Sequence, residues 1–103
     1  RGMNCVNCYQ LPALREADQR TPEGKAHALG RQALLETAVS GDRPLDAASL
    51  RDLLTYHGNP GLGCHGGHDM MHTEFSVIAL PATGRVLLRE GYPCRGAYTE
   101  YRV

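Results

Sequence analysis

The alternation of hydrophobic and polar positions predicts a short strand, two helices and a hairpin, in that order along the chain. Residues 3–9 alternate apolar with polar side chains, which is the two-residue period of a β-strand. From Pro22 to Val39 the apolar positions take up helical spacing. A second helical segment runs from Asp46, a residue type that caps helices, to about Tyr56.

The first predicted helix has a clear start signal and is preceded by a predicted loop. Thr21 can cap the helix, and Pro22 is suited to its first position. The residues that share helical spacing are Ala26, Leu29, Ala33, Leu34, Leu35 and Val39. Gln10-Leu11-Pro12 ends the strand, because proline cannot donate a hydrogen bond to a sheet, and residues 13–21 are expected to form a loop.

The hairpin is predicted in the last third of the chain. Residues 73–80 place Phe75, Val77 and Ala79 on one face and Ser76, Ile78 and Leu80 on the other, and apolar side chains on both faces favour a covered strand. The turn at residues 81–84 leads into a partner strand at residues 85–90. The tail of residues 91–103 is expected to pack across the sheet. The predicted fold class is α+β, with antiparallel strands and two helices.

Composition and charge narrow the class of protein. The chain has 103 residues, of which 42% are hydrophobic and 21% charged, and its eleven basic residues balance eleven acidic ones. A chain without net charge has no general attraction for nucleic acid or for an anionic membrane. No apolar run reaches the roughly 20 residues that a membrane helix needs, and no signal segment is recognisable, so a cytoplasmic location is expected.

The cysteines and histidines allow a metal site. Cys5 and Cys8 form a C-x-x-C pair, and three histidines follow Cys64 within eight residues. Thiolate and imidazole are the ligands that zinc prefers, and four of them close a tetrahedral structural site. One hypothesis is therefore a small zinc-stabilised binding module that uses Cys5, Cys8, Cys64 and either His68 or His72.

Two other cysteine chemistries are open. An extracellular module would join Cys5 or Cys8 to Cys64 or Cys94 in a disulfide, although the lack of a signal segment favours reduced thiols. A nucleophilic thiolate would need a base within hydrogen-bond reach, and His65 directly follows Cys64. Adjacent side chains usually diverge, so an inert role is favoured for each cysteine.

Six short motifs, in this order, resemble the C-terminal third of the penicillin acyltransferase-like family, which includes isopenicillin-N acyltransferase and carcinine-type amide hydrolases. The motifs are Val6-Asn7-Cys8 with the following Leu11-Pro12 loop, Gly30-Arg31-Gln32-Ala33-Leu34-Leu35, the L-x-x-L-L-x-x-H stretch from Leu50 to His57, Gly63-Cys64-His65, Thr73-Glu74-Phe75-Ser76, and Gly91-Tyr92-Pro93-Cys94. The resemblance covers nearly the whole chain.

The resemblance implies an αββα sandwich and a cysteine N-terminal nucleophile released by autoprocessing. Residues 1–103 would be a single C-terminal segment of this larger catalytic domain, inactive alone. An upstream segment or a partner chain would supply the nucleophile. The substrate would be a small amide or thioester, and the reaction hydrolysis or acyl transfer without a cofactor or metal. Strand 3–9 would pair beside the hairpin, and the sheet would present a large apolar face for another chain to cover.

Two residues carry catalytic roles by this resemblance. Asn7 matches an asparagine that helps to hold the oxyanion, and a side-chain amide on a strand can donate to a developing oxyanion. His65 stands where the family has an arginine at the active site. Histidine is shorter and mostly neutral near pH 7, which weakens the pairing of this position with a carboxylate or oxyanion.

Overall fold

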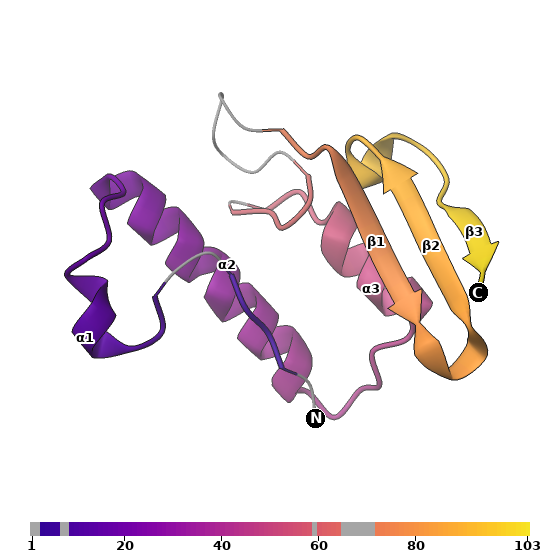
Figure 1. The fold of residues 1–103 in the computed structure, drawn as a ribbon, viewed down its shortest axis with the longest axis horizontal. Coiled ribbons are helices and arrows are strands. Elements are labelled where there is room, and N and C mark those ends of the chain that lie inside the picture. The colour runs from indigo at the N-terminus through magenta and orange to yellow at the C-terminus, as the bar shows by residue number, and fades with distance from the viewer. Residues whose placement is uncertain (1–2, 7–8, 59, 65–71) are drawn as a thin grey trace. The chain divides into compact units, whose positions relative to one another are not determined.

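The computed structural model describes residues 3–6, 9–58, 60–64 and 72–103 (Figure 1). The chain divides into two compact units, Arg1–Pro44 and Leu45–Val103, which are described separately below. Helices and an antiparallel sheet are both present, so the fold class is mixed α+β, as predicted. Within the described residues, no helix has the length and apolar character that a membrane crossing requires.

The first unit is built on the long helix α2 (Pro22–Ser40). Thr21 Oγ1 accepts a hydrogen bond from the backbone N–H of Gly24 at 3.1 Å, which satisfies one of the unpaired donors at the helix start. The predicted helix and its cap are therefore confirmed. A short helix, α1 (Pro12–Arg15), lies where the sequence predicted only a loop. Its first position is proline, which fits a helix start as well as a strand end.

The predicted strand at residues 3–9 is wrong for its described part. Residues 3–6 are in no strand, and Asn7 and Cys8 lie outside the described residues. The side-chain amide of Gln32 on α2 donates to Asn4 Oδ1, and Figure 1 shows this segment running alongside the helix. The alternating segment thus forms a hydrogen bond with a side chain of α2 and does not pair with a strand. The predicted apolar stripe of α2 also differs, because Ala28 and Gln32 are buried and Leu29 is exposed.

The second unit begins with helix α3 (Ala47–Thr55). Asp46 Oδ1 accepts from the backbone N–H of Ser49 at 2.8 Å, and the Ser49 hydroxyl accepts from the backbone N–H of Asp46 at 2.9 Å. This reciprocal pair is a capping box, which satisfies two donors at once. It confirms the second predicted helix and its cap.

A three-stranded antiparallel sheet follows in the order β1 (Phe75–Leu80), β2 (Arg85–Glu90) and β3 (Thr99–Arg102). The hairpin of β1 and β2 is confirmed, with Val77 opposite Leu88. Its turn is a 3-10 helix, η1 (Pro81–Thr83), followed by Gly84 at φ 60°. That left-handed conformation suits glycine. Strand β3 is a new finding, since the sequence predicted only a tail across the sheet.

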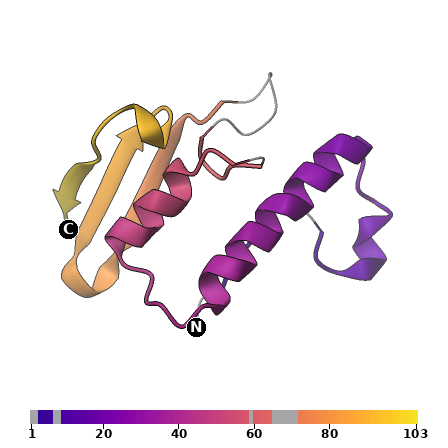
Figure 2. The ribbon, with the colours of Figure 1, turned by 180° about the vertical axis from the view of Figure 1, so that it is seen from behind.

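The two faces of the sheet differ in cover. One face packs against α3, as Figures 1 and 2 show, and its Ile78 and Leu87 are only 3% and 2% exposed. The other face is mostly apolar, with Glu90 opposite Phe75 and Thr99 opposite Leu88 as its polar members. We call the apolar part of this face the open sheet face; it consists of Phe75, Val77, Ala79, Val86, Leu88 and Tyr101. Phe75, Val77 and Tyr101 are 63%, 47% and 52% exposed. The prediction that β1 is covered on both faces is therefore wrong, because only the face toward α3 is covered.

Candidate functional site

The structure describes only part of the predicted site. Both residues with a predicted catalytic role, Asn7 and His65, lie outside the described residues. The predicted zinc ligands Cys8 and His68 also lie outside them. Their roles stay predictions.

The other predicted zinc ligands have local surroundings of their own. Cys5 belongs to the first unit, is exposed, and donates weakly to the Val6 carbonyl at 3.5 Å. His72 Nε2 lies 2.6 Å from a carboxylate oxygen of Glu74, and both side chains are largely exposed. Cys64 is fully buried, and the metal-ligating side chains beside it are His57 and Cys94.

A group of metal-ligating side chains, which we call the Cys/His cluster, lies in the second unit and consists of His57, Cys64 and Cys94. One imidazole nitrogen and the two sulfurs all lie within 4.8 Å of one another. Cys64 is buried, whereas His57 and Cys94 are exposed. Among the described residues, Cys5, Cys64 and Cys94 are not joined in disulfides, so the sulfurs are thiols.

Close backbone packing fixes the position of Cys64. A Cβ on Gly61 would lie 2.3 Å from the carbonyl oxygen of Cys64, and a Cβ on Gly63 would lie 2.9 Å from Pro93 Cγ. No real Cβ approaches that closely, so both positions require glycine. The Thr73 hydroxyl donates to the Gly63 carbonyl at 2.6 Å and ties this loop to the segment that enters β1.

Cys94 and His57 are placed by the ends of their elements. Pro93 is buried and begins the 3-10 helix η2 (Pro93–Arg95), which contains Cys94. His57 follows the end of α3, where Tyr56 turns into extended backbone. Helix α3 and η2 are in contact, so the chain after the helix and the turn before β3 meet at the cluster.

The electrostatics of the cluster disfavour a thiolate at Cys64. Burial raises the pKa of the Cys64 thiol, and a hydrogen bond with the Cys94 side chain raises it further. A hydrogen bond with the Cys94 backbone and, to a smaller extent, the Arg95 guanidinium act in the opposite direction, but the net pKa of the Cys64 thiol is raised. Cys64 is therefore a protonated, poorly nucleophilic thiol near neutral pH, and a thiolate there would need a cation beside it.

The predicted metal site contains Cys64 but neither of its neighbours in the structure, His57 and Cys94. His57 ends an L-x-x-L-L-x-x-H stretch, and Cys94 ends a G-x-P-C turn. Each motif ends on a metal-ligating side chain, and this shared feature was the signal available. The signal stays weak without the fold, because the two residues lie far apart in the chain.

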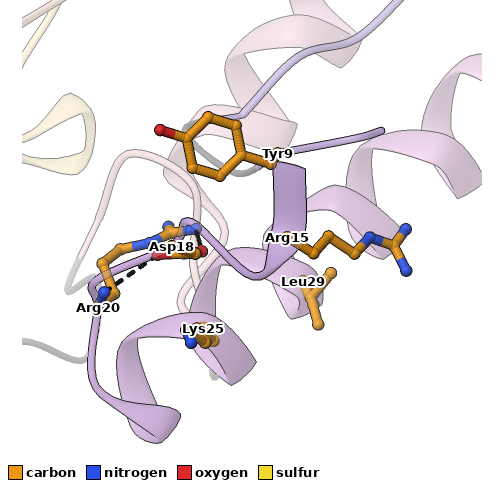
Figure 3. Close-up of a pocket in the computed structure, with 6 residues that line it drawn as sticks. All are labelled: Tyr9, Arg15, Asp18, Arg20, Lys25 and Leu29. Atoms are coloured by element: carbon orange, nitrogen blue, oxygen red, sulfur yellow. Dashed lines mark hydrogen bonds and ion pairs between the residues drawn. The ribbon is translucent and has the colours of Figure 1, made fainter. Parts of the chain in front are cut away.

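The first unit has a small pocket between α1, α2 and their connection (Figure 3). Its volume is about 100 Å³, which is small for an organic ligand. The lining residues are Tyr9, Arg15, Asp18, Arg20, Lys25 and Leu29. Arg20 and Asp18 form an ion pair within it, drawn as dashed lines in Figure 3. The arrangement is cationic, with one carboxylate already neutralised by a guanidinium.

Comparisons with models of known protein families, with curated proteins and with solved structures find no match to this chain. A function for this chain is therefore inferred from its sequence motifs and from the geometry described above.

Proposed function

We propose that this chain is the C-terminal segment of a cysteine N-terminal-nucleophile amide hydrolase or acyltransferase with an αββα sandwich. The order of its six motifs supports the proposal, from Val6-Asn7-Cys8 to Gly91-Tyr92-Pro93-Cys94. The order of its elements, with α2 and α3 followed by the antiparallel hairpin of β1 and β2, is compatible with it.

The observation that carries the proposal is the open sheet face. In an αββα sandwich two sheets face each other, and each has helices on its outer side. The second unit has helix α3 on one side of its sheet and exposed Phe75, Val77 and Tyr101 on the other. Exposed apolar side chains grouped on one face are a feature of protein–protein contacts, among other interaction sites. A second sheet, carried by another segment of the precursor or by a partner chain, would cover it.

The proposed chemistry needs the nucleophile to come from that other segment. The thiol of an N-terminal cysteine attacks the carbonyl carbon of a small amide or thioester, and its own amino group takes the proton. The negative charge that develops on the carbonyl oxygen is held in part by the Asn7 amide. The C–N or C–S bond of the substrate then breaks, and the amino group returns the proton to the departing amine or thiol. The acyl group of the resulting thioester passes to water or to an amine, which frees the cysteine thiol. His65 serves as a polar group near the substrate. A reducing cytoplasm would keep the nucleophile as a thiol.

The test uses the complete gene product. Its intact masses, measured after native purification, should show this segment together with a polypeptide whose first residue is cysteine. In an assay with small amides and thioesters, Asn7→Ala should lower kcat by about 100- to 1,000-fold with little change in KM. The matched control is Asn4→Ala, because the Asn4 amide already accepts from Gln32. It should leave kcat unchanged.

Two results would overturn the proposal. One is a purified gene product that contains no polypeptide with an N-terminal cysteine. The other is an Asn7→Ala enzyme that turns over amides as fast as the Asn4→Ala control.

A further inference from the structure

The Cys/His cluster has the donor set of a transition-metal site that the proposed function does not use. Its two sulfurs and one imidazole nitrogen converge within 4.8 Å. Zinc takes this combination of ligands, and three protein ligands with a fourth position left open is a recurrent zinc arrangement. We propose that His57, Cys64 and Cys94 bind a zinc ion, with the fourth coordination position open to water.

The nature of the donors selects the class of metal. Calcium and magnesium take oxygen ligands, and the cluster offers sulfur and nitrogen. Thiolate and imidazole together suit zinc, which has no preferred geometry of its own and accepts four ligands. Zinc would also keep the Cys64 sulfur as a thiolate in its buried position, because a coordinating thiol is deprotonated outright.

The distances require little rearrangement. Zinc–sulfur bonds of about 2.3 Å and zinc–nitrogen bonds of about 2.0 Å place tetrahedral ligand atoms roughly 3.5 to 4 Å apart. The cluster atoms lie within 4.8 Å of one another, so small side-chain movements bring them to bonding geometry. The Cys64 backbone is held by the Gly61 and Gly63 contacts. The buried Pro93 holds the backbone that presents Cys94.

Burial predicts where the open position lies. Cys64 binds from the protein interior, and the exposed His57 and Cys94 bind from the surface side. The fourth position therefore faces solvent. The ion would fasten the segment after α3 to η2, and so would stabilise the second unit. This role is independent of the amide chemistry proposed above.

The test adds zinc chloride alone to the reduced full chain. Competition with a chromophoric chelator should show one zinc ion bound per chain. Cobalt(II) in its place should give the strong visible bands of tetrahedral coordination and a sulfur-to-cobalt charge-transfer band. His57→Ala and Cys94→Ser should each lower zinc affinity by more than about 100-fold, since loss of an outer-shell partner already costs about 10- to 100-fold.

The matched control is the double variant Cys5→Ser/Cys8→Ser, which removes the other cysteine pair of the chain. It should bind one zinc ion with unchanged affinity. His57 and Cys94 are exposed, so their variants are expected to fold, and circular dichroism would verify this. The proposal is overturned if the reduced chain binds no zinc. It is also overturned if the double variant loses zinc while folded His57→Ala and Cys94→Ser keep it.

Discussion

At the scale of single residues, Asp18 shows how a local contact sets a charge. Asp18 Oδ1 accepts a hydrogen bond from Arg20 Nε at 2.9 Å and another from the Arg20 backbone N–H at 3.0 Å. These hydrogen bonds lower the pKa of Asp18 from 3.8 to about 2. Because the pKa is lowered in the folded state, the stabilisation is present above about pH 4 and is lost as the pH falls toward 2.

Arg20→Ala should therefore raise the pKa of Asp18 toward the ordinary aspartate value. An NMR pH titration of the Asp18 carboxyl would measure this shift. Arg15→Ala is the control, since Arg15 lines the same pocket and its side chain makes no hydrogen bond to Asp18 among those described; its backbone carbonyl, which accepts from the Asp18 backbone N–H at 3.2 Å, is kept in the variant. An Asp18 that titrates near pH 4 in the unaltered chain would contradict the prediction.

The Cys/His cluster marks the limit of sequence reasoning at this scale. A hydrogen bond such as that of Thr21 to Gly24 is local, and the residue types alone predicted it. Cys64 meets Cys94 only because α3 and η2 pack together, and no local pattern encodes that contact. The predicted ligand set instead joined Cys64 to the C-x-x-C pair of Cys5 and Cys8 and to the nearby His68 or His72.

At the scale of elements, the cap of α3 gives a clean stability prediction. Asp46→Ala removes the side chain that accepts from Ser49, so the capping box loses one of its two hydrogen bonds. The free energy of unfolding should fall by about 1 kcal/mol. Urea denaturation followed by circular dichroism would measure it. Asp52→Ala, at an exposed interior position of the same helix, should change stability by less than about 0.5 kcal/mol.

Elements were predictable where their signals were local. The helix caps at Thr21 and Asp46 and the turn at Pro81–Thr83 fixed α2, α3 and the β1–β2 hairpin. Strand β3 has no such signal, because Thr-Glu-Tyr-Arg lacks an apolar alternation and becomes a strand through pairing with β2. Residues 3–6 show the reverse case, in which a short alternating pattern has no neighbouring strand to pair with.

At the scale of the whole molecule, the two faces of the sheet should respond differently to charge. Val77→Lys adds a charge to the open sheet face, where the side chain is 47% exposed. The isolated chain should become more soluble, with its free energy of unfolding changed by less than about 0.5 kcal/mol. Ile78→Lys, one residue along on the covered face, should unfold the second unit, because an unpaired charge would be buried against α3.

Light scattering at rising protein concentration would measure solubility, and thermal circular dichroism would measure folding. Equal destabilisation by the two lysines would mean that the open sheet face is covered in the isolated chain. In the complete gene product, Val77→Lys should in addition weaken assembly with the segment that covers this face.

The glycines around Cys64 have a consequence for recognising related chains. Positions 61 and 63 admit no side chain without moving the backbone that presents the thiol. Any homologue that keeps this arrangement must therefore retain a spaced signature, H-x-x-x-G-x-G-C, together with a later P-C pair. Such a pattern can be searched directly in genome sequences, and it would separate chains that inherited the zinc-binding geometry from those that share only the surrounding sheet.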